Sequence, residues 1–176
     1  MPVPVARGAC LAALVVCLGA CSPPLDWRDV RPDGTALKLQ FPCRPDRQQR
    51  TLKLAGVPVR LSLQACSAGG RTWGLGVADV GDPARVEAAL GELRAAAAAN
   101  VGAPVPALEP LSLPGATPHA GAGRARLQGR APDGTPVHME LAFFARGTLV
   151  FQASALGSSP AADPVQIFFG ALGFET

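Results

Sequence analysis

The sequence predicts an α+β fold, a mostly antiparallel sheet of about six to seven strands with two helices packed on it. Apolar and polar residues alternate over much of 37–77 and again over 124–153, with turn residues between the alternating runs. The apolar period becomes that of a helix over 86–97 and over 165–172. The chain has 176 residues, and we expect one domain with its own core over 35–176.

The first strands follow a turn at Pro32-Asp33-Gly34-Thr35, in which Pro presets φ and Gly accepts a positive φ. The segment Pro42–Asp46 ends the first strand, and Ala55-Gly56 marks a later turn. We expect the alternating runs to form an antiparallel meander. They span residues 37–41, 52–54, 57–64 and 73–77.

The first helix is predicted to begin at Asp82-Pro83, an N-cap followed by Pro at the first helical position, and to end at Asn100-Val101-Gly102. Its apolar face consists of Val86, Leu90, Leu93 and Ala97. The proline-rich stretch 102–121 then indicates an extended surface crossing, in which 111–113 is a candidate edge strand.

The second group of strands is expected over 124–130, 137–143 and 149–153. Its turn Pro132-Asp133-Gly134-Thr135 repeats the earlier turn letter for letter. The last helix is capped at Ser159-Pro160 or at Asp163-Pro164, with Gly173 as its C-cap. Its apolar face consists of Val165, Phe168, Phe169 and Leu172.

The expected core combines the inward positions of these strands and helices. It comprises Leu37, Leu39, Phe41, Leu61, Leu63, Trp73, Leu75, Val77, Leu90, Leu141, Phe143, Phe151 and Phe168. The order strands, helix, strands, helix and the strand-ending pair Phe41-Pro42 resemble the Mog1/PsbP-type fold. The resemblance implies an antiparallel sheet that carries helices.

The N-terminus has the pattern of a signal peptide over residues 1–20. Arg7 precedes an apolar run over 8–20, which is shorter than the ~20 residues that span a bilayer. The run ends in Leu18-Gly19-Ala20-Cys21, which resembles the lipobox of bacterial lipoproteins. The resemblance implies cleavage before Cys21, a diacylglycerol on its thiol and an acylated amine. An ordinary cleaved signal and an uncleaved anchor are the alternatives.

A lipid anchor on Cys21 makes residues 21–34 a short tether between membrane and domain. Trp27 in this tether either lies at the membrane interface or docks on the domain, and we favour docking. By the same resemblance, Ser22 after the lipidated Cys indicates the periplasmic side of the outer membrane, because Asp there retains such proteins at the inner membrane.

The five cysteines divide by position. Cys10 and Cys17 lie in the signal peptide and Cys21 carries the lipid, which leaves Cys43 and Cys66. An oxidising compartment and an even remainder predict a disulfide between these two. One observation opposes this disulfide. By strand alternation, Cys43 falls on the same core-facing side as Leu39, whereas Cys66 falls on the same side as the polar Gln64.

Residues suited to catalysis are few. His138 lies on the outward side of its strand with Glu140, and His119 lies among prolines, so we predict no enzyme activity and no cofactor. Cys43, Cys66, His119 and His138 match no compact zinc spacing, and we predict no metal site.

Two basic stretches stand out. One contains Arg44, Arg47, Arg50 and Lys53; the other is Arg124, Arg126 and Arg130 along one strand face. The second is a candidate anion site, because Arg forks onto phosphates and carboxylates, or else a solvated strand face. With 16 Lys and Arg against 13 Asp and Glu, and no interleaved aromatics, we expect no nucleic-acid binding.

These observations lead to a non-enzymatic lipoprotein that acts as an interaction or envelope-maintenance module. Its expected partners are the membrane, through the lipid on Cys21, and another envelope protein. The alternative is a carrier or sensor that binds a small or anionic ligand between sheet and helices.

Overall fold

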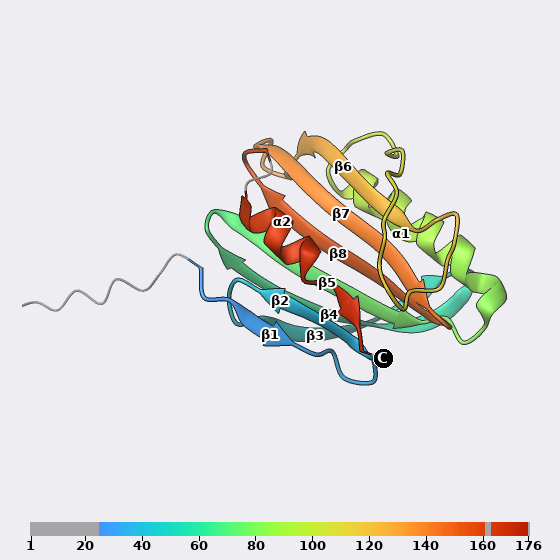
Figure 1. Cartoon of the computed structure of the whole chain (residues 1–176). Coiled ribbons are helices and arrows are strands. Elements are labelled where there is room, and N and C mark those ends of the chain that lie inside the picture. The colour runs from blue at the N-terminus through green and yellow to red at the C-terminus, as the bar shows by residue number, and fades with distance from the viewer. Residues whose placement is uncertain (1–24, 161–162, 176) are drawn as a thin grey trace, which may run out of the picture.

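The fold is a six-stranded antiparallel sheet with a smaller sheet beside it, seen in a computed structural model that describes residues 25–160 and 163–175 (Figure 1). The large sheet has the order β3-β4-β5-β8-β7-β6, and the small sheet has the order β1-β2-β9. The large sheet contains β3 (Asp46–Leu54), β4 (Val57–Ala68), β5 (Arg71–Asp79), β6 (Gly123–Arg130), β7 (Pro136–Arg146) and β8 (Leu149–Gly157). The small sheet contains β1 (Arg28–Val30), β2 (Leu37–Phe41) and β9 (Gly173–Phe174).

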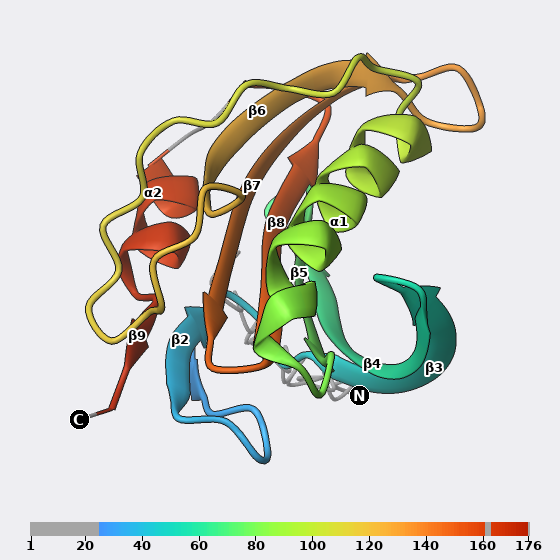
Figure 2. The ribbon, with the colours of Figure 1, turned by 90° about the vertical axis from the view of Figure 1, so that its right-hand side faces the viewer.

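Two helices cover opposite faces of the large sheet, as Figure 2 shows: α1 (Val86–Asn100) on one face, α2 (Asp163–Gly170) on the other. The small sheet packs on the same face as α2, where Phe41 of β2 contacts Phe168 with ring centroids 5.4 Å apart. The α+β class and the two packed helices are therefore confirmed. The two-sided cover requires apolar side chains on both faces of the central strands.

Each face of the sheet has its own hydrophobic cluster. On the α2 face, Phe168 is fully buried against Phe41 and Trp73. On the α1 face, Leu90 is fully buried beside Leu141 and Phe143. Of the thirteen core residues expected, eleven are buried, but Leu61 and Leu63 are only half-buried. They line a hollow between α1 and the hairpin of β3 and β4.

The start and end of α1 agree with the prediction. The Asp82 side chain accepts a hydrogen bond from the Ala84 N–H at 2.9 Å, and a short 3-10 turn (Pro83–Arg85) leads into the helix. Gly102 follows the last turn with φ +62°, a conformation that favours glycine.

The C-terminal segment corrects one prediction. Helix α2 begins at Asp163, the second of the two predicted caps, and its predicted apolar face is buried. Gly173 does not cap the helix; it belongs to β9, which pairs with Lys38 of β2. Pairing with β2 satisfies the backbone there in place of a helical cap.

The N-terminal strands differ most from the prediction. The strand at 37–41 is not part of the meander; as β2 it pairs with β1 and β9 instead. Residues 28–30, expected in the tether, form β1, and the Asp26 N–H donates to the Pro42 carbonyl at 2.8 Å. The stretch 111–113 forms no strand. The docking of Trp27 is confirmed, because its ring lies 6.3 Å from that of Trp73.

Residues 1–20 and the lipid acceptor Cys21 lie outside the described part of the chain. Within the described part, none of the helices is long and apolar enough to cross a membrane.

Candidate binding groove

A groove of about 760 Å³ lies between α1 and the hairpin of β3 and β4. We call this hairpin, residues 46–68, the β3–β4 ribbon, and the hollow the α1 groove. Figure 2 shows the ribbon curling out of the sheet and back beneath α1. The ribbon side of the groove carries Gln48, Arg50, Leu52, Leu61 and Leu63, and the helix side carries Leu93, Ala96, Ala97 and Asn100.

The floor of the groove is hollow because two glycines replace side chains on β5. Gly76 lies between Leu63 of β4 and Gln152 of β8, and Gly74 lies between Ala65 and Ser154. A Cβ atom at Gly74 would lie only 2.8 Å from Ser154 Oγ, whereas one at Gly76 would lie 3.4 Å from Leu63. Gly76 is thus the position at which an added Cβ makes only ordinary contacts, with the flexible ends of Leu63 and Leu61, so a substitution there can fill the groove.

The groove is closed at one end by a hydrogen bond between its two walls. At the closed end, the Ala55 N–H at the ribbon tip donates to Glu92 Oε2 of α1 at 2.9 Å. The other end is lined by Ser67, Thr72 and Asn100. This is also the end of the domain from which the chain leads back toward Cys21, since Leu25 packs against Gly69 in the β4–β5 turn.

The lining combines apolar and polar groups with one acidic residue, Asp46. Leu61, Leu63 and Leu93 are half-buried, and Gln152 and Ser154 add hydrogen-bonding groups on the floor. Arg50 is exposed and has no acidic partner among the described residues. Such a lining favours binding of a partly apolar ligand, with a cation at its wall.

The second basic stretch lies on the opposite face of the sheet, and its cations already have partners. Arg124 donates to Glu140 Oε2 at 2.9 Å and stacks over the Phe169 ring at 4.6 Å. Arg126 pairs with Glu109 at 2.6 Å. Arg130 donates to the Gly134 carbonyl at 2.8 Å and so holds the β6–β7 turn. The geometry gives these three arginines structural roles and does not join them to the α1 groove.

Glu140 is not on an outward face, contrary to the prediction. Its side chain is buried because its side of β7 also carries Ala142 and Phe144 of the α2-face core. The ion pair with Arg124 compensates for that burial. His138 lies across from Gln128 on the same face, half-buried, and lines a small pocket together with Glu140 and Arg126.

His119 has an acidic neighbour that sequence proximity did not indicate. Its Nδ1 lies 3.6 Å from Glu87 Oε2 on α1, so the proline-rich crossing lies against the helix at this point. Glu87 is more than thirty positions away in the chain, and only the fold brings the two together. We find no group of His, Cys, Asp or Glu suited to a metal ion among residues 25–160 and 163–175.

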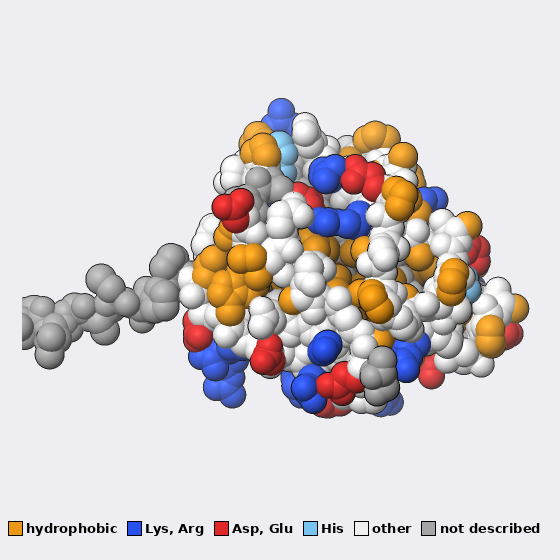
Figure 3. Space-filling model, viewed as in Figure 1, with side chains coloured by type: hydrophobic (Ala, Val, Ile, Leu, Met, Phe, Trp, Pro, Cys, Tyr) orange, Lys and Arg blue, Asp and Glu red, His pale blue; other side chains and the backbone are white. Residues whose placement is uncertain are grey.

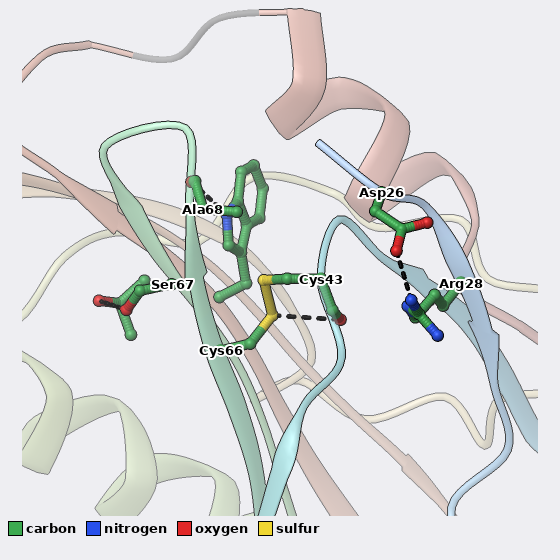
Figure 4. Close-up of a disulfide and its surroundings, with 8 residues drawn as sticks. Asp26, Arg28, Cys43, Cys66, Ser67 and Ala68 are labelled. Atoms are coloured by element: carbon green, nitrogen blue, oxygen red, sulfur yellow. Dashed lines mark hydrogen bonds and ion pairs between the residues drawn. A yellow bond between two sulfur atoms is a disulfide. The ribbon is translucent and has the colours of Figure 1, made fainter. Parts of the chain in front are cut away.

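The disulfide between Cys43 and Cys66 is confirmed, with Cα atoms 6.0 Å apart (Figure 4). It joins the segment after β2 to β4, and so ties the small sheet to the large one. The sequence had placed Cys66 on the same strand face as Gln64, which is polar, and Cys43 on a core face. Both faces are in fact covered, because Gln64 and the neighbouring Trp73 are buried on that side of the sheet. Nearby, the Trp73 indole N–H donates to the Ala68 carbonyl at 3.1 Å.

A buried arginine was missed by the sequence analysis. Arg71 is 9% exposed and donates to the carbonyls of Ser159 and Pro160, which fixes the segment that leads toward α2. Nothing in the sequence distinguishes it from the exposed arginines, because its partners are backbone atoms far along the chain.

Comparison of the chain with protein-family models, with curated proteins and with solved structures gives no match.

Proposed function

We propose that this chain is a non-enzymatic, membrane-tethered interaction module of the bacterial envelope, and that the α1 groove is its contact site. The groove is the observation that carries the proposal. Its volume of about 760 Å³ lies within the ~300–1,000 Å³ typical of ligand sites. Its half-buried leucines leave apolar surface that a partner can cover, and its walls hold no acid–base pair.

The tether supports an envelope role. Between the proposed lipid on Cys21 and Leu25 lie only Ser22, Pro23 and Pro24. An extended chain covers ~3.5 Å per residue, so the anchored domain would sit roughly 15 Å or less from the bilayer. Hydrophobic side chains gather at the end of the domain where this segment begins (Figure 3). The disulfide is in keeping with an oxidising compartment.

A carrier of a small amphiphile is the second candidate. The groove is closed at the Ala55 end and has Arg50 on its wall, an arrangement that also suits a molecule with an apolar body and an anionic group. The two candidate functions predict different occupants of the groove: a protein for the interaction module and a small molecule for the carrier.

A photo-crosslinking amino acid at Leu63, used in intact cells, separates them. We expect a protein adduct at Leu63, its loss when Gly76→Val fills the groove, and none from the same amino acid at Ile167, an exposed residue on α2. A small-molecule adduct would favour the carrier. No specific adduct at Leu63 would contradict both.

The anchor is tested separately by mass spectrometry. The wild-type protein should carry acyl chains on Cys21, and Cys21→Ala should be lost from the membrane fraction. A free Cys21 thiol in the mature protein would refute the tether.

A further inference from the structure

We infer that the α1 groove receives an extended, acidic segment of another polypeptide, which adds as a strand to the free edge of β3. This inference rests on the proposed function and specifies the partner's conformation and charge. It draws on the strand edge, the curl of the ribbon and the charges on β3.

The two edges of the large sheet differ. At β6, the N–H and C=O of Arg124 exchange hydrogen bonds with Glu109 of the crossing, at 2.9 and 2.8 Å, so that edge is partly covered. At β3, all described pairing is with β4, and the outer side has no partner among the described residues. A nine-residue strand with a free edge is a template for another strand.

The hairpin geometry identifies which backbone groups point outward. Ala55 and Gly56 both have positive φ, +48° and +80°, as in the two-residue turn that closes a tight hairpin. In such a hairpin the flanking residues, Leu54 and Val57, share both hydrogen bonds, and bonded pairs then alternate along the strands. The even-numbered residues of β3 therefore bond β4, and the N–H groups of Gln49 and Thr51 face the free edge.

The curl of the ribbon brings this edge toward α1 (Figure 2). A strand added at ~4.8 Å from β3 would continue the curl and send alternate side chains to the groove face, next to Gln48, Arg50 and Leu52 of β3. Main-chain hydrogen bonds and the apolar wall would thus contribute to binding the same segment.

The charges on β3 favour an acidic partner. The strand carries Arg47, Arg50 and Lys53 against a single acid, Asp46. Only Arg47 has an acidic partner in the described chain, Asp33 at 2.9 Å. A second copy of β3 would add the same positive excess, which disfavours self-pairing.

A synthetic octapeptide of alternating Val and Glu tests the inference by titration calorimetry on the folded domain. We expect binding that weakens with salt, and much weaker binding of the Val–Lys counterpart. Gln49→Pro and Thr51→Pro should each reduce the affinity by roughly tenfold or more, because Pro removes an outward N–H but no bond to β4. Gln49→Thr and Thr51→Val, which keep the N–H, are the matched controls.

Two outcomes would overturn the inference: no binding of the acidic peptide, or equal binding by the proline variants and their controls. Its failure is distinguishable from that of the proposed function. If Leu63 still crosslinks an envelope protein in the Gln49→Pro and Thr51→Pro variants, the groove binds a partner without strand addition. A lipid or other small molecule at Leu63 would refute the peptide as occupant.

Discussion

The backbone N–H of Ala55 donates to the Glu92 carboxylate across 2.9 Å, and this bond joins the tip of the β3–β4 ribbon to α1. Most of β3 is exposed, so the ribbon has little core of its own to hold its shape. The contact closes one end of the α1 groove and sets the separation of its two walls. The conformation of Ala55 therefore bears on both stability and groove geometry.

Ala55→Asn should stabilise the protein by about 0.5–1 kcal/mol. Ala55 has φ +48°, a region that costs an ordinary L residue roughly 1 kcal/mol and that Asn adopts more readily, especially before Gly. Urea unfolding measures the change. Ala55→Val, whose branched Cβ fits this region poorly, should destabilise. Equal midpoints for Asn and Val would contradict the turn geometry.

Loss of the disulfide should cost about 2–4 kcal/mol of unfolding free energy. Cys43 and Cys66 are separated by 23 positions and join the two sheets, so the bond restricts a long loop in the unfolded chain. The double variant Cys43→Ala, Cys66→Ala should show a lower urea midpoint than wild type. Reducing agent should lower the wild-type midpoint in the same way and leave that of the double variant unchanged. A wild type insensitive to reduction would contradict the prediction.

The local elements were predictable because they depend on residues close in sequence. The Asp82-Pro83 cap and the positions of most large-sheet strands follow from turn chemistry and periodicity. The pairing of β2 with β9 was not predictable, because these two strands lie near opposite ends of the chain. The burial of Glu140 follows from a second covered face, which alternation on one strand does not indicate.

The groove could not be predicted from the pattern. Leu61 and Leu63 alternate like core residues, and only the curl of the ribbon leaves them half-buried. Gly74 and Gly76 were a usable signal, since paired glycines on one strand face leave a gap in the sheet surface. The prediction used only the alternate residues of this strand, Trp73, Leu75 and Val77, as core positions.

Acid should weaken the fold partly through Asp79. Hydrogen bonds from the Thr148 side chain and the Gly81 N–H lower the pKa of Asp79 below its ordinary value of 3.8. A pKa that is lower in the folded state stabilises the fold above the ordinary value, and this contribution is lost as the pH falls from the ordinary value through the lowered one. Thr148→Val should raise the pKa of Asp79 toward its ordinary value, as measured by NMR titration of its carboxyl group. An unchanged titration would remove Thr148 as the cause.

The same substitution, glycine to alanine, should have opposite effects at two positions near α1. Gly129 of β6 lies against the end of the helix, where an added Cβ would be 2.0 Å from the Val101 carbonyl oxygen. That oxygen also accepts the Arg130 N–H at 2.9 Å, so neither backbone can retreat without straining this bond. Gly129→Ala should therefore cost at least about 2 kcal/mol.

Gly91, in the middle of α1, has open space around its Cβ position. Gly91→Ala should stabilise the protein by about 0.5–1 kcal/mol, because alanine loses less backbone entropy in a helix. Thermal unfolding of both variants measures the two effects side by side: Gly129→Ala tests the close backbone contact, and Gly91→Ala tests helix propensity. If Gly129→Ala were as stable as wild type, α1 would not end against β6 as described, and the helix wall of the groove would have to be placed differently.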